Sequence, residues 1–190
     1  MTSSAVNVVK GGIVRLHEQV LKLANRVSDE QLAWRLNLHT PSISFHIWHI
    51  ARWADRLQAR IPDMSPEMTE RLGKATEVWE TEKLTGSWKI TVGALGYGDT
   101  GMEMSDEMAA NFVLPPKSVL VGYLERALAA VERSIDAIDA ELFMQEWTNL
   151  YETNGLVGES LVSHLGHISR HLGMIEAMIG VQGMEGTATI

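Results

Sequence analysis

The stretch ISFHIWHIARWADRLQARI, residues 43–61, decides the fold of this 190-residue chain. Its apolar residues return every three or four positions, which is the period of one face of an α-helix. Three further stretches, which begin near Val9, Leu120 and Leu161, carry the same alternation. Four helices with one apolar stripe each bury these stripes best against one another. The sequence therefore predicts an all-α fold, a four-helix bundle.

Residues that typically begin or end helices flank these stretches. Ser28 with Gln31 predicts a capping box that opens a short helix, and Ser65-Pro66 predicts another helix start. Thr40-Pro41 is interpreted as the N-cap and first position of the helix that carries residues 43–61. Gly180 is expected just after the fourth long helix, where a C′ glycine belongs.

The link between the second and third long helices is unusually long, from about Ile61 to Pro115. It predicts a helix near 66–80, a glycine-rich loop near 93–101 and a short helix after Ser105. A connection of this length can cross the bundle and place the two helices that it joins parallel. We expect one domain over residues 1–182 and a flexible tail over 183–190.

Composition excludes several classes of protein. There is no cysteine, hence no disulfide framework and no thiolate metal ligand. Sixteen basic residues against twenty-four acidic give a net charge of −8, and no basic cluster suited to nucleic acid is present. The N-terminus does not resemble a signal peptide, and no apolar run is long enough to span a membrane. We expect a cytoplasmic protein that binds small molecules or protein partners, with no nucleic-acid or membrane partner.

Five of the seven histidines fall in two of the predicted helices, His46 and His49 in one and His164, His167 and His171 in the other. His167 and His171 are four residues apart, so both imidazoles can face one point, as in helical histidine pairs that share a metal ion. His49 is the best candidate for a third ligand, with His46 as its rival and His164 as another inward candidate. Three neutral imidazoles suit Zn²⁺, Ni²⁺ or Fe²⁺ and leave a coordination position open. The alternative is that these histidines are polar residues at the edge of a buried stripe.

Other residues have simpler interpretations. His17 and His39 are expected to be exposed or capping, and a flexible crossover loop is a better interpretation of Gly96–Gly101 than a dinucleotide site, because no helix opens within its glycines. Asp55, Arg52 and Glu176 lie near the predicted ligands and can orient them, although solvated or interhelical charges are the more common role of such residues. Among six tryptophans, Trp48 or Trp53 can wall an apolar pocket, with core packing as the alternative.

Three stretches of this chain resemble the DinB/YfiT-like superfamily: residues 28–56, the Trp- and glycine-containing link 79–109, and residues 159–180. The resemblance implies a four-helix bundle with a long crossover between its second and third helices. It also implies a divalent metal bound by one histidine of the second helix and an H-x-x-x-H pair of the fourth. On this sequence these histidines match His49, in His49-Ile50-Ala51, and His167 with His171. Met174 stands where the family commonly has glutamine.

The resemblance carries expectations about function as well. Some relatives are transferases or isomerases that use a low-molecular-weight thiol such as mycothiol or bacillithiol, and homodimers are common among them. We therefore expect a divalent-metal-dependent enzyme, a thiol-dependent transferase or isomerase, that acts on a small-molecule substrate. The alternative is a non-catalytic bundle that binds a metal or ligand as a sensor or serves as a dimerisation module.

Overall fold

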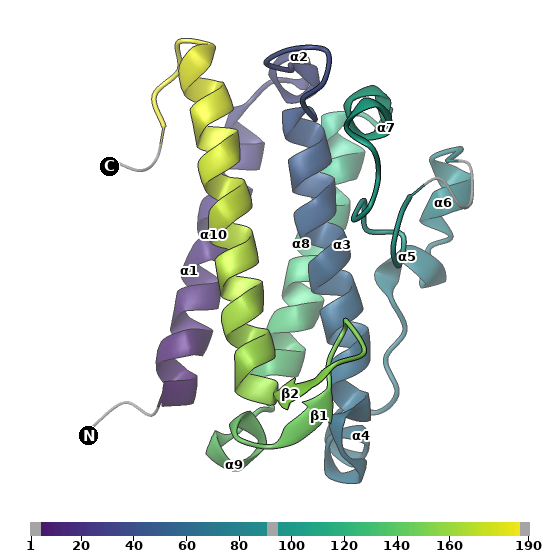
Figure 1. Ribbon diagram of the computed structural model, residues 1–190, viewed down its shortest axis with the longest axis vertical. Coiled ribbons are helices and arrows are strands. Elements are labelled where there is room, and N and C mark those ends of the chain that lie inside the picture. The colour runs from purple at the N-terminus through teal and green to yellow at the C-terminus, as the bar shows by residue number, and fades with distance from the viewer. Residues whose placement is uncertain (1–4, 91–94, 187–190) are drawn as a thin grey trace.

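Four long helices form the body of the protein in the computed structural model, which describes residues 5–90 and 95–186. They are α1 (Ala5–Arg26), α3 (Ile43–Arg60), α8 (Lys117–Asp136) and α10 (Val157–Val181). Figure 1 shows α1 and α10 running in one direction and α3 and α8 in the other. The predicted all-α bundle is confirmed, and so is the parallel arrangement of the two helices joined by the long crossover.

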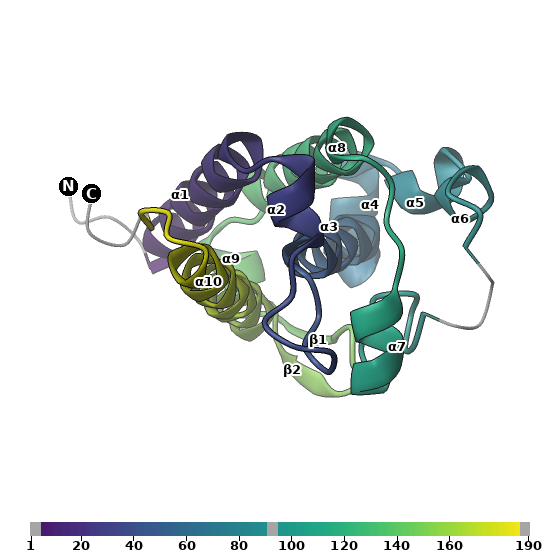
Figure 2. The same ribbon diagram turned by 90° about the horizontal axis from the view of Figure 1, so that it is seen from above.

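Helix α3 is the most deeply buried element, because α8, α10 and the crossover surround it (Figure 2). Every residue from Ile43 to Asp55 is buried. The apolar positions of the sequence pattern supply its core contacts, and Ile43, Ile47 and Ile50 are fully inaccessible. Its histidines, arginine and aspartate are therefore taken out of water together with the apolar stripe, which requires partners for each of them.

The ends of the helices agree with the sequence in part. The capping box of Ser28 with Gln31 begins α2 (Asp29–Ala33) and is confirmed. The predicted N-cap of α3 is wrong, because Ser42 rather than Thr40 accepts the hydrogen bond from the backbone of Phe45. The placement of Gly180 is also wrong. Helix α10 continues to Val181, and Gly183, at a φ of +78°, takes the left-handed conformation after it.

The crossover consists of short helices laid along α3 and α8. They are η1 (Ile61–Met64), α4 (Pro66–Leu72), α5 (Val78–Thr81), α6 (Leu84–Ser87) and α7 (Asp106–Asn111). The helix predicted near 66–80 is broken, because Gly73 adopts a φ of +70° after α4. Ser65 and Ser105 cap α4 and α7 as expected.

The glycine-rich segment is a tight loop in its described part, residues 95–101, while residues 93 and 94 of the predicted loop lie outside the described residues. Gly96, Gly98 and Gly101 all have positive φ, and a Cβ on Gly101 would lie 2.8 Å from Phe45 and Trp48. The next helix, α7, begins only at Asp106. No helix opens within the glycines, which confirms a loop rather than a dinucleotide fingerprint.

One element was not predicted from the sequence. After α9 (Ala140–Phe143), strands β1 (Glu146–Thr148) and β2 (Asn154–Leu156) form an antiparallel hairpin that leads directly into α10 (Figure 1). Three-residue strands carry too little alternation to stand out in a sequence. Within the described ranges, none of the helices is both long and apolar enough to cross a membrane. The last four residues of the predicted flexible tail, 187–190, lie outside the described residues.

Candidate metal centre

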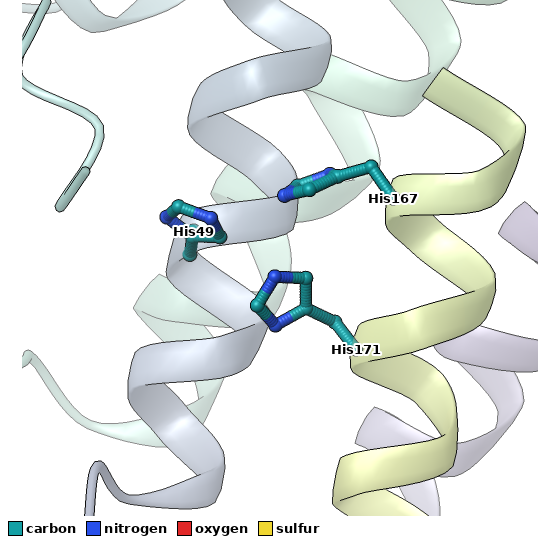
Figure 3. A group of neighbouring side chains, drawn as sticks. All are labelled: His49, His167 and His171. Carbon is teal, nitrogen blue, oxygen red and sulfur yellow. The ribbon is translucent and has the colours of Figure 1, made fainter. Parts of the chain in front are cut away.

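Three histidines from two helices converge at the middle of the bundle. His49 projects from α3, and His167 and His171 project from successive turns of α10 toward it (Figure 3). One ring nitrogen from each lies within 4.8 Å of the others. The four-residue spacing on α10 thus places both imidazoles on one face, as the sequence predicts, and the neighbouring α3 supplies the third.

Hydrogen bonds on the outer nitrogens orient two of these rings. His49 Nδ1 donates to the backbone carbonyl of Thr100, which the crossover loop brings against α3. His171 Nδ1 lies 3.0 Å from Nδ1 of His46. In both rings Nε2 is then the nitrogen left for a ligand. Contacts of this kind fix the ring orientation and tautomer of metal-binding histidines.

The structure also distinguishes His49 from His46, the other candidate for the third ligand. His46 is buried one turn before His49, but it contacts the outer nitrogen of His171 and does not belong to the converging group. His46 therefore lies behind a candidate ligand, where it can hold the ring of His171.

His167 differs from its two neighbours. Both of its ring nitrogens are buried, and neither has a hydrogen-bond partner among the described residues. A buried polar group without a partner costs roughly 1–3 kcal/mol. A cation shared with His49 and His171 would supply a partner for one of these two nitrogens, so the residues present fit a metal ion.

The cluster is held in the protonation state that a metal requires. Burial, reinforced by the neighbouring histidines, lowers the pKa of His167 to about 3 and that of His171 to about 2. Burial likewise lowers the pKa of His49, although its bond to Thr100 opposes the shift. All three imidazoles are thus neutral at pH 7, and neutral imidazole is the form that binds divalent cations.

A cavity of about 190 Å³ opens beside His167. It lies between α3, the start of α10 and the loop of the hairpin. Trp53, Leu57, Leu150 and Tyr151 give it apolar walls, and the Trp53 and Tyr151 rings are 5.2 Å apart. Of the two tryptophans considered from the sequence, Trp53 thus lines a pocket, whereas Trp48 is fully buried in the core.

A second group of buried charges lies one turn further along α3. Arg52 pairs with Glu77 of the crossover at 2.7 Å, donates to Tyr123 of α8 at 3.1 Å, and lies over the ring of Trp79. It also donates to the carbonyls of Gly98 and Asp99, at 3.2 and 2.8 Å.

Asp55 completes this group. Its carboxylate accepts hydrogen bonds from the backbone of Val78 and Trp79, both at 2.8 Å, and from the hydroxyl of Tyr123 at 3.0 Å. Burial raises the pKa of Tyr123 well above its usual value, which keeps that hydroxyl protonated as a donor. Arg52 and Asp55 are therefore not solvated charges. They bind the crossover to the bundle, and the loop that Arg52 holds at Gly98 and Asp99 also carries Thr100, the acceptor of His49.

Among the remaining histidines, the sequence interpretation of His17 is wrong. His17, expected to be exposed or capping, is 1% exposed and lies between Glu132 and His164, at 2.6 and 3.3 Å. Its place on the apolar stripe of α1, four residues after Ile13, was the signal for burial. His164 therefore faces His17 rather than the converging group. His39 is exposed, as expected.

Comparison with known proteins gives the chain a family. The sequence model of the DinB superfamily matches residues 13–175 of this chain, which is nearly the whole bundle with its crossover. This chain belongs to the DinB superfamily. The solved structures include a conserved protein of locus from Enterococcus faecalis that superposes with a TM-score of 0.75 at 16% identity, over 96% of this chain and all of that one. At that identity the likeness concerns the fold alone. No match was found among curated proteins.

Proposed function

We propose that this DinB-superfamily protein is a divalent-metal-dependent enzyme in which His49, His167 and His171 hold the ion, Zn²⁺, Ni²⁺ or Fe²⁺. The observation that carries the proposal is the buried imidazole of His167, which has no hydrogen-bond partner among the described residues, beside His49 and His171, whose Nδ1 atoms are engaged by Thr100 and His46. Three imidazoles leave at least one coordination position open to a further ligand.

We propose further that the open position takes a low-molecular-weight thiol for transfer or isomerisation of a small-molecule substrate. A bound divalent cation of this type lowers the pKa of a coordinated thiol or water, so that a nucleophile is available near neutral pH. The protein's own residues orient and shield the site. Thr100 and His46 fix two of the rings, and the apolar walls at Trp53 and Tyr151 exclude water beside the third.

The first experiment measures metal content and affinity. We expect one equivalent of divalent metal in protein purified without a histidine tag, and its loss in His49→Ala, His167→Ala and His171→Ala. His39→Ala, which alters an exposed histidine, is the matched control and should retain the metal. Absence of metal in the parent protein, together with thermal stability that EDTA leaves unchanged, would contradict the site.

A second experiment separates the enzyme from a non-catalytic metal-binding bundle. In protein loaded with Co²⁺, thiol coordination should produce a sulfur-to-metal charge-transfer absorption that is lost in His167→Ala. Thiol-dependent turnover of an electrophile should follow the same loss. Tight metal binding without thiol coordination or turnover favours the sensor function instead.

The proposed setting is a cytoplasmic homodimer. Sedimentation of the full chain should give a mass near twice 21.1 kDa, whereas a monomer mass contradicts this part of the proposal.

A further inference from the structure

A chain of hydrogen-bonded polar groups, two of them buried histidines, leads from the surface of α8 to the cavity. It starts at Glu132 of α8, whose carboxylate lies 2.6 Å from Nδ1 of His17 on α1. Nε2 of His17 then lies 3.3 Å from Nε2 of His164 on α10, and His164 lines the cavity. None of these three residues belongs to the converging histidines.

These contacts restrict where the protons of the two rings can lie. An ionised carboxylate only accepts hydrogen bonds, so Nδ1 of His17 is the donor to Glu132. With His17 as a neutral imidazole, its Nε2 is then an acceptor, and Nε2 of His164 carries the proton between them. The remaining ring nitrogen of His164, Nδ1, is left without a proton. It has no hydrogen-bond partner among residues 5–90 and 95–186.

Three other polar groups around the cavity are engaged in hydrogen bonds within the protein. The hydroxyl of Ser160 accepts from Trp147 at 3.0 Å, and the carboxylate of Glu159 accepts from the backbone of Leu156 at 2.8 Å. Asn149 bonds within its own loop, to Thr153. Nδ1 of His164 is thus available as a hydrogen-bond acceptor in this lining, together with the ring nitrogens of His167 and the hydroxyls of Ser163 and Tyr151.

The volume limits what can bind. A cavity of about 190 Å³ is smaller than the roughly 300 Å³ and above that is typical of sites for drug-sized ligands. An apolar cavity of about 150 Å³ already accepts benzene. One ring or a short branched chain with a single polar substituent fits this space, and the rings of Trp53 and Tyr151 offer flat contact surfaces for it.

We propose that this cavity binds a compact molecule with an apolar body and one hydrogen-bond donor, and that the unprotonated Nδ1 of His164 accepts that hydrogen bond. Glu132 and His17 are positioning residues, because they hold His164 in the accepting tautomer. The inference rests on the proposed function in one respect, that the ligand is the substrate of the adjacent metal centre. Burial, together with the nearby His17, lowers the pKa of His164 to about 3, so the acceptor stays neutral at pH 7.

The test compares phenol with anisole, its methyl ether, which has a similar shape and no donor. Binding is followed by NMR shift changes in protein as purified and after dialysis against EDTA. We expect phenol to bind about threefold to tenfold more tightly in both preparations, the ratio that one hydrogen bond provides. Equal affinities, or saturable binding of neither compound, would overturn the proposal.

Two variants and one spectrum test the role of the hydrogen-bonded series of Glu132, His17 and His164. His164→Phe should abolish the preference for phenol. Glu132→Gln, which no longer dictates the tautomer of His17, should lower the preference at least about twofold. Glu125→Gln, an exposed change two turns earlier on α8, is the matched control and should leave the preference unchanged.

The imidazole ¹⁵N spectrum should show His164 protonated at Nε2 and unprotonated at Nδ1. The opposite tautomer overturns the proposal even where His164→Phe fails to fold. Loss of phenol selectivity in a protein that binds metal leaves the proposed function standing. Selective phenol binding in a protein without metal affinity removes only that function.

Discussion

Helix α3 carries two groups of buried polar residues one turn apart, and they differ in completeness. Arg52 and Asp55 find all their partners within the chain, from the crossover, from α8 and from α3 itself. His49 and the α10 histidines that face it find partners only on their outer nitrogens, and His167 finds none in the described part of the chain. We call these the closed group and the open group.

The difference distinguishes structural from functional burial. A protein that buries charges for stability satisfies each of them, because an unpaired buried group costs more than the pair contributes. Burying neutral imidazoles without partners costs free energy. A protein can tolerate that cost where a ligand supplies the partner. The closed group fastens the crossover, and the open group is one that could hold a metal ion.

Lowering the pH should reveal the largest difference between the open group and the closed group, in their effect on the free energy of unfolding. The unfolded chain binds protons at histidines with an ordinary pKa near 6.5, whereas burial lowers the pKa to about 3 in His167 and about 2 in His171. The unfolded state therefore binds more protons between these values, and stability is lost as the pH falls below about 6.5. We expect the metal-free protein to lose several kcal/mol between about pH 7 and pH 5, since each histidine contributes up to about 1.4 kcal/mol per pH unit.

Urea unfolding at a series of pH values measures this loss. His171→Phe should flatten the dependence, and His39→Phe, which changes an exposed ring, should not. A stability that is constant across this range contradicts the assignment of the open group as buried and neutral.

Removal of one member of the closed group should have the next largest effect. Asp55→Ala leaves the Arg52 guanidinium with a single carboxylate and the backbone of Val78 and Trp79 without its acceptor. Breaking a buried pair in this way costs about 3–5 kcal/mol of the free energy of unfolding. Asp63→Ala, at an exposed pair with Arg60, is the control and should cost less than about 1 kcal/mol. Similar losses for both variants, measured by urea unfolding, would argue against a closed group.

A milder change tests whether the closed group acts on the open one. Arg52→Lys keeps the charge but cannot hold Glu77 and the carbonyls of Gly98 and Asp99 together. The neighbouring Thr100 carbonyl is then held less firmly against His49. We expect metal affinity to fall about tenfold, at the lower end of the effect of such supporting contacts. Competitive titration with a chromophoric chelator measures it, and an unchanged affinity shows that the two groups are independent.

The sequence predicts the bundle well for a physical reason. Four long apolar stripes specify both the helices and their facing sides, and the long link permits the parallel pair. The pairing of His167 with His171 follows from helical geometry alone. The hairpin before α10 could not be predicted in the same way, because its strands span only three residues each and carry no repeating pattern.

The contacts that support the site could not be predicted from the sequence, for a different reason. The acceptor for His49 is a backbone carbonyl 51 residues away, and no residue type announces it. His17 was misjudged although its spacing from Ile13 and Val20 places it on a buried face. Charge alone suggested solvated positions for Arg52 and Asp55, whereas a helix with almost no exposed side buries its charges as well.

The contact between Thr100 and His49 joins the cluster to a part of the chain that is not one of the bundle helices. A change of the loop at Thr100 would therefore act on the support of His49, while α3 holds the residue itself in place. Each such change would alter how strongly His49 donates electron density to a cation, without moving its α-carbon. The orientation of the His49 ring and the position of its backbone are in this way set by different stretches of the polypeptide.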